Sequence, residues 1–107
     1  FDADPLIRWA DRLRDMGVGL PIHAGIAGPA KLQTLIKFAV TCGVGPSVKV
    51  LKRRARDLSK LLLPYEPTDV LTDLERKLGD RTDSPIEQVH FFPLGGIKSC
   101  VEWAAKQ

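Results

Sequence analysis

The sequence predicts an α/β fold in which short apolar strands alternate with amphipathic helices. Three observations predict it. Apolar side chains recur at helical spacing in five segments, two short segments are apolar without that spacing, and glycines or prolines separate the segments. The predicted order is helix, strand, helix, helix, helix, strand, helix. Such alternation favours parallel strands joined by right-handed crossovers.

The first helix is predicted over residues 4–16. Asp4 and Pro5 suit a helix start, because an Asp side chain accepts hydrogen bonds from free backbone N–H groups and Pro has a preset φ. Apolar side chains follow at helical spacing. Gly17 then suits the left-handed position that ends many helices.

Two strands are predicted, over residues 18–24 and 88–94, although Pro21 cannot donate a hydrogen bond to a sheet. Phe1 and Asp2 are predicted to end a further strand. Strands so few in number leave sheet edges unpaired and do not cover both faces of a parallel sheet. We therefore expect the chain, which begins without Met, to be a segment of a longer protein.

Four more helices are predicted from apolar spacing and from the glycines and prolines at their ends. They cover residues 30–42, 45–63, 68–78 and 97–106. A glycine-punctuated loop is predicted over residues 24–29, between the first strand and the second helix.

The composition excludes several classes of protein. The chain has 107 residues, of which 44% are hydrophobic and 27% charged, and this composition is typical of a globular domain. No apolar run approaches the roughly 20 residues that span a bilayer, so we expect no membrane association, and no signal peptide is visible. Cys42 and Cys100 are too few for a disulfide framework or a thiolate metal site. The expected location is the cytoplasm.

A basic row is the most conspicuous local pattern. Lys49, Arg53, Arg56 and Lys60 lie at helical spacing on the predicted third helix. The row suits contact with phosphates, but it also suits the solvated face of an amphipathic helix. No aromatic residues interleave with it and the net charge is only +3, so nucleic acid is the less favoured partner.

The residues alone reveal no catalytic constellation and no metal site. His23 and His90 lie on predicted strands without acidic or sulfur neighbours at ligand spacing. The loop over 24–29 lacks the G-x-G-x-x-G spacing and the Lys-Ser/Thr of a nucleotide-binding loop. Gly95 and Gly96 follow the second strand, where a tight turn explains them as well as a ligand does.

Three stretches in order resemble the last part of the methylenetetrahydrofolate reductase family. They are similar to the family's F-F-(D/E) strand end, its P-I-x-P-G-I strand and loop, and its H-F-Y-T-L-N strand. The first is Phe1-Asp2, followed by the helix that ends at Met16-Gly17. The second is Leu20-Pro21-Ile22-His23-Ala24-Gly25-Ile26, followed by Phe38 and by Cys42-Gly43-Val44-Gly45-Pro46-Ser47. The third is Val89-His90-Phe91-Phe92-Pro93-Leu94, followed by the helix that contains Trp103.

The resemblance implies a flavin-dependent (β/α)₈ TIM barrel that reduces 5,10-methylenetetrahydrofolate to 5-methyltetrahydrofolate with NAD(P)H. Residues 1–107 would be a single segment, the C-terminal third of the barrel domain and about its last three βα units. The missing N-terminal part, either as a second polypeptide or as the rest of a longer chain, would bind most of the FAD and hold the catalytic residues, so this segment alone would be inactive. A homo-oligomer is compatible with the family. The choice between NADH and NADPH stays open.

The resemblance also implies site residues. Phe38, Thr34 and Gln33 would contact substrate, with Phe38 near a stacked ring. Six residues would lie on the active-site rim: Asp2, His23, Gly25, His90, Gly95 and Gly96. The last two replace an Asn-Arg pair whose Arg binds the folate glutamate tail in the family.

Two alternatives remain at this point. The replacement by Gly95-Gly96 suits a divergent barrel homologue with another one-carbon or accessory role. The basic row suits a small anion- or nucleic-acid-binding module that uses the helix over 47–63.

Overall fold

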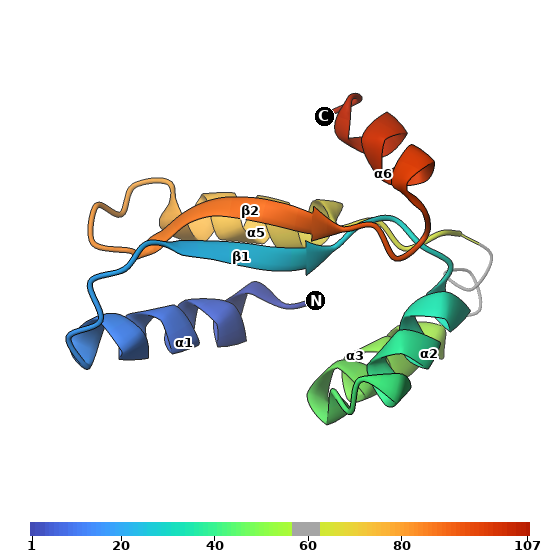
Figure 1. Ribbon diagram of the computed structural model, residues 1–107, viewed down its shortest axis with the longest axis horizontal. Helices are drawn as coiled ribbons and strands as arrows, with labels where there is room; N and C mark the ends of the chain where they lie inside the picture. The colour runs from blue at the N-terminus through green and yellow to red at the C-terminus, as the bar shows by residue number, and fades with distance from the viewer. Residues whose placement is uncertain (57–62) are drawn as a thin grey trace. The chain divides into compact units, whose positions relative to one another are not determined.

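The computed structural model describes residues 1–56 and 63–107. These residues form an α/β structure with five helices and one sheet of two parallel strands, as the sequence predicts for the class (Figure 1). In chain order the elements are α1 (Ala3–Asp15), β1 (Ile22–Ala27), α2 (Leu32–Thr41), α3 (Gly45–Ala55), α5 (Thr68–Leu78), β2 (Ile86–Phe92) and α6 (Ile97–Ala104).

The prediction of a TIM-barrel portion is wrong. In such a barrel one helix separates each strand from the next, whereas three described helices, α2, α3 and α5, lie between β1 and β2. Phe1 and Asp2 do not end a further strand either. Asp2 is the N-cap of α1, in an extended conformation with φ −123° and ψ 139°. The described residues thus hold one two-stranded parallel sheet in place of about three barrel units.

Both strands are shifted from their predicted positions. β1 begins at Ile22, because Pro21 has no N–H to donate and the preceding Leu20 is 73% exposed. It then continues through Ala27, into the residues predicted as a loop. β2 begins at Ile86, two residues earlier than predicted, and ends before Pro93.

The helices agree better with their predicted positions. α1 ends where expected, and Gly17 has a φ of 86° in the left-handed region. Gly43 does the same after α2, with a φ of 70°. α3 is described as far as Ala55 with Arg56 as its C-cap, and Lys60 lies outside the described residues.

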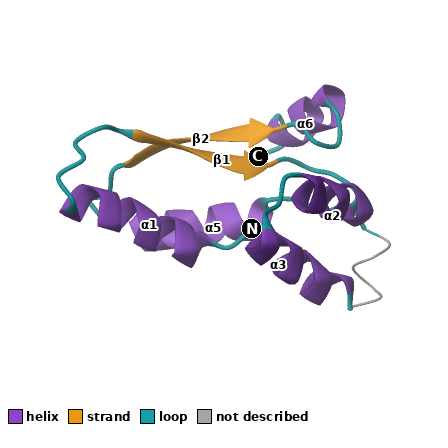
Figure 2. Cartoon of the chain, turned by 60° about the horizontal axis from the view of Figure 1, so that its bottom comes forward, coloured by secondary structure: helices purple, strands orange, loops and turns teal. Residues whose placement is uncertain are grey.

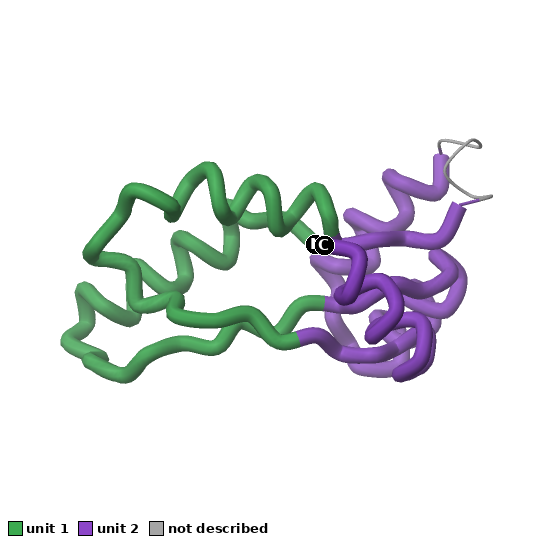
Figure 3. Tube along the Cα trace, turned by 90° about the horizontal axis from the view of Figure 1, so that it is seen from above, with its two compact units in different colours: residues 1–26, 68–90 green, residues 27–67, 91–107 purple. Residues whose placement is uncertain are grey.

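The chain divides into two compact units, shown in different colours in Figure 3. Unit 1 comprises residues 1–26 and 68–90, and unit 2 comprises residues 27–67 and 91–107. Each strand passes from unit 1 to unit 2 near its carboxyl end, β1 after Ile26 and β2 after His90.

Unit 1 has a small core beneath the strand pair. α1 and α5 contact each other and run along the same side of the strands (Figure 2). β1 buries alternate residues, so Ala24 and Ile26 are buried while His23 and Gly25 are exposed. Half of the buried core is alanine, which allows close packing but buries little apolar area. Its members are Ala3, Ala10, Ala24, Ile26, Val70 and Leu74.

Ion pairs join the helices of unit 1 to the turn before β2. Arg81 binds Asp11 of α1 at 2.8 Å and Asp83 at 2.9 Å, and Arg14 binds Asp83 at 2.7 Å. Lys77 of α5 binds Asp4 in the first turn of α1. Asp4 therefore acts as a cross-helix partner, whereas the sequence predicts a helix cap there.

Unit 2 is built around a helical hairpin. α2 and α3 contact each other, and Leu35 and Leu51 are fully buried between the elements of this unit. Among the helices of the described residues, none combines the length and the apolar character needed to cross a membrane.

The Arg81 pairs predict an acid-sensitive contribution to stability. The hydrogen bond from Arg81 holds the pKa of Asp11 below its ordinary value of 3.8. A carboxyl group whose pKa is lower in the folded state stabilises the fold above its unfolded pKa and loses this effect as the pH falls through the folded pKa. The variant Asp11→Asn should therefore melt several degrees lower than the wild type at neutral pH, with the difference shrinking below about pH 4.

Thermal unfolding followed by circular dichroism across this pH range checks the prediction. Asp80→Asn is the matched control, because Asp80 is exposed at the end of the preceding turn and should show no such difference. An Asp11→Asn effect that persists unchanged at low pH would contradict the role of the carboxylate.

Candidate functional site

We consider one cleft in unit 1 and one cleft in unit 2. The cleft of unit 1, about 440 Å³, is lined by Arg14 and by residues 18–21 and 82–87, which lead into β1 and β2. The cleft of unit 2, about 320 Å³, is lined by residues that follow the two strands. Ligands of open parallel sheets bind outside the carboxyl ends of the strands. The cleft of unit 2 is therefore the candidate site.

Three segments form this cleft. Pro29, Ala30 and Lys31 come from the loop after β1, and Pro64 and Glu66 come from the segment before α5. The third segment is the turn after β2 with α6, and it contributes Gly95, Ser99, Glu102, Trp103 and Lys106.

Backbone hydrogen bonds fix these segments to one another. The N–H of Gly28 donates to the carbonyl of Phe92 over 2.9 Å, which joins the loop after β1 to the last residue of β2. Ala30 and Tyr65 exchange two hydrogen bonds, of 3.1 and 2.8 Å, as an isolated antiparallel bridge. Arg54 of α3 lies 5.4 Å from the ring centre of Tyr65, a distance at which a guanidinium is attracted by the ring face.

Gly95 and Gly96 are required by the turn itself. A Cβ on Gly95 would lie 2.2 Å from the carbonyl oxygen of Pro29 and 2.8 Å from Cα of Ala30. Gly96 is the N-cap of α6 and has a φ of 108°, a backbone conformation that residues other than glycine rarely adopt. Ser99 secures the turn by donating its hydroxyl toward the carbonyls of Gly95 and Gly96.

Trp103 forms an apolar wall of the cleft and carries an unsatisfied donor. Its ring meets Phe91 edge to face, with 5.4 Å between ring centres and 77° between planes. The side chain is only 7% exposed, and its Nε1 has no hydrogen-bond partner among the described residues. Buried indole N–H groups usually find an acceptor.

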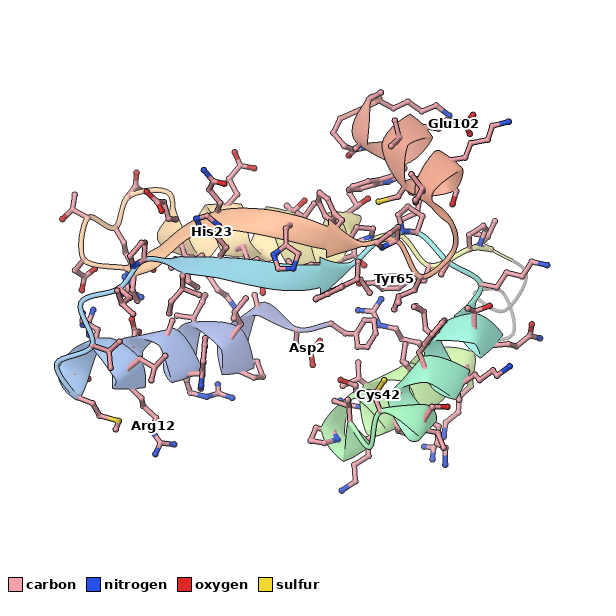
Figure 4. The ribbon with its side chains drawn as sticks, viewed as in Figure 1. Asp2, Arg12, His23, Cys42, Tyr65 and Glu102 are labelled. Carbon is pink, nitrogen blue, oxygen red and sulfur yellow. The ribbon has the colours of Figure 1, made fainter. Side chains whose placement is uncertain are left out.

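The charges around the cleft are of both signs. Lys31 and Lys106 offer ammonium donors, and Glu66 and Glu102 offer carboxylate acceptors. Glu102, labelled in Figure 4, also pairs loosely with Lys98 at 3.9 Å. The cleft can hold a small polar molecule, and among its described lining residues no nucleophile pairs with a base.

The predicted substrate-binding residues lie on α2 rather than in the lining of this cleft. Thr34 and Phe38 are one helical turn apart and share a face of the helix. Thr34 is half-buried, Gln33 is exposed, and Phe38 is 41% exposed. The structure therefore brings Thr34 and Phe38 together but does not bring Gln33 onto their face of the helix.

The predicted rim residues are distributed between the two units. Asp2, His23, Gly25 and His90 belong to unit 1, and Gly95 and Gly96 belong to unit 2. All six are exposed. Four of these residues therefore belong to one unit and two to the other, and the rim that they would form stays a prediction.

His23 has an acidic neighbour that the sequence analysis missed. Its Nε2 lies 3.3 Å from Oε2 of Glu87, and both side chains are more than half exposed. His23 is the second residue of β1 and Glu87 is the second residue of β2. Equal register in two parallel strands is the signal that would have found the pair.

The described residues do not fit FAD or a metal centre. No group of three or more His, Cys, Asp or Glu side chains among them is arranged to hold a metal ion. The glycines of the loops press against their neighbours: a Cβ on Gly28 would lie 2.9 Å from Sγ of Cys100, and Gly95 abuts backbone. Gly28 and Gly95 are therefore held against neighbouring atoms and leave no room beside them for a pyrophosphate.

Replacing Gly95 tests the close packing of the turn. Gly95→Ala should lower the free energy of unfolding by about 2–3 kcal/mol, because backbone atoms rather than flexible side chains occupy the new methyl position. Gly45→Ala is the matched control, since nothing lies within 4 Å of its Cβ position and its φ is not positive. Urea unfolding followed by circular dichroism measures both. Equal stabilities of the two variants would contradict the packing described for Gly95.

We compared the chain with models of known protein families. No protein-family model matches this chain.

Proposed function

We propose that this chain contributes part of the folate-binding surface of a methylenetetrahydrofolate reductase-like oxidoreductase. Such an enzyme reduces 5,10-methylenetetrahydrofolate to 5-methyltetrahydrofolate with NAD(P)H. Three motifs that occur in the family's order support the proposal. The observation that carries it is the exposed ring of Phe38 on the same face of α2 as Thr34.

The α2 face has the chemistry that a pterin ring needs. A planar heteroaromatic ring stacks on an aromatic side chain, and part of the Phe38 ring is open to solvent. Thr34 carries a hydroxyl that both donates and accepts hydrogen bonds one turn from Phe38, and Gln33, on the neighbouring side of the helix, carries an amide. α2 itself is anchored by Leu32, Leu35 and Ala39. The buried residues of α2 therefore fix the position of the helix that carries Thr34 and Phe38.

The proposal assigns the flavin to another polypeptide, because the described residues do not fit it. When bound there, FAD supplies hydride transfer. The residues of this chain would bind and orient the folate. The two-stranded sheet supports a larger assembly, since parallel sheets are ordinarily covered on both faces and β1 leaves His23 and Gly25 exposed.

Calorimetric titration with 5-methyltetrahydrofolate tests the folate-binding surface. The wild-type chain should bind it, and Phe38→Ala should weaken binding about tenfold, which corresponds to about 1.4 kcal/mol of lost stacking. Val40→Ala is the matched control, because Val40 is 61% exposed on the same helix and is not part of the Thr34–Phe38 face.

Two results would overturn the proposal. One is no binding by the wild-type chain. The other is an equal effect of Phe38→Ala and Val40→Ala, which would show that general loss of apolar surface, rather than the ring of Phe38, weakens the complex.

A further inference from the structure

The charges of this chain are segregated between its two units. Unit 1 contains six Lys and Arg residues against ten Asp and Glu, whereas unit 2 contains ten Lys and Arg against three Asp and Glu. The modest net charge of +3 is therefore the sum of an acidic part and a strongly basic part. Charge asymmetry of this kind is typical of chains that bind polyanions.

The acidic unit is largely compensated from within. Six of its carboxylates pair with Lys, Arg or His of the same unit. They are those of Asp4, Asp11, Asp15, Asp73, Asp83 and Glu87. In unit 2, Lys98 is the cation with a carboxylate partner among the described residues, and Arg54 lies over Tyr65. The excess positive charge of unit 2 is thus left for an external anion.

α3 concentrates this charge on one face. Lys49, Lys52, Arg53 and Arg56 are all exposed, and helical geometry places them within an arc of about 100° around the axis and over about 10 Å along it. Leu51 on the opposite side is fully buried and anchors the helix. In Figure 4, side chains that end in nitrogen surround the α2–α3 hairpin.

We propose that this basic face of α3 binds the phosphate backbone of double-stranded nucleic acid without sequence preference. A length of about 10 Å spans about three phosphates of one strand, which are spaced at about 3.4 Å along the duplex axis. No aromatic side chain lies on the arc, so the stacking that single-strand binders use is missing. A second copy of the chain is a poorer partner, because six of the ten carboxylates of unit 1 already pair with cations of the same unit.

Fluorescence anisotropy with a short labelled DNA duplex, from about 50 to about 200 mM salt, tests the proposal. The logarithm of the binding constant should fall with the logarithm of salt concentration with a slope of about −3, as expected for three to four phosphate contacts. The double variant Arg53→Gln/Arg56→Gln should bind at least tenfold more weakly at low salt, with the slope reduced in magnitude by about 2.

Arg8→Gln/Arg12→Gln provides the matched control. These two arginines are exposed on α1 at the same helical spacing as two neighbouring cations of α3, and the net charge changes equally. The control should retain the wild-type affinity and slope. Circular dichroism of both double variants verifies that each is folded.

Four outcomes would overturn the proposal. They are absence of binding at about 50 mM salt, equal losses in the two double variants, tighter binding to the separated single strand than to the duplex, and tighter binding to vesicles that contain phosphatidylserine. The last two would assign the basic face to other anionic partners. None of the four bears on folate binding at α2.

Discussion

The close approach of Gly95 to Pro29 and Ala30 is the constraint on which unit 2 depends. A side chain at Gly95 would separate the loop after β1 from the turn after β2. The hydrogen bond between Gly28 and Phe92 reinforces the same junction. Because the turn leads directly into α6, it also determines where Trp103 meets Phe91 and where the cleft opens.

Unit 1 depends on ion pairs as well as on its apolar core. Its core is rich in alanine, which provides little apolar area to stabilise the packing of α1 and α5. Individual surface ion pairs contribute little, but several charges that share partners are a better source of stability. Arg81 and Arg14 share Asp11 and Asp83 in this way. The network holds α1 to the turn that leads into β2.

The α/β class and the order of elements were predictable because local patterns determine them. Apolar spacing placed the helices, and Gly17 and Gly43 marked their ends correctly. The strand bounds were less predictable. Pro21 and Pro93 limit where strand pairing can begin or end, but a proline alone does not show whether the strand precedes or follows it in the sequence. The barrel prediction failed because three short motifs do not determine how many helices separate two strands.

The candidate site was predictable only in part. A tight turn was one of two explanations for Gly95 and Gly96, and the sequence does not show that Pro29 lies against Gly95. The pairing of His23 with Glu87 needed the register of the two strands. The basic row was visible in the sequence. Only the division into two units showed that the acidic residues of unit 1 offset the positive charge of unit 2 in the net charge of the chain.

The positions of the two tryptophans give the molecule a built-in optical comparison. Trp9 belongs to unit 1 and is 51% exposed, whereas Trp103 belongs to unit 2 and is 7% exposed. An indole in water emits at longer wavelength than one in an apolar wall. Unfolding of unit 2 should therefore shift the emission spectrum strongly, while unfolding of unit 1 should shift it little. Intrinsic fluorescence can thus reveal whether the two units lose their structure in one step or in two.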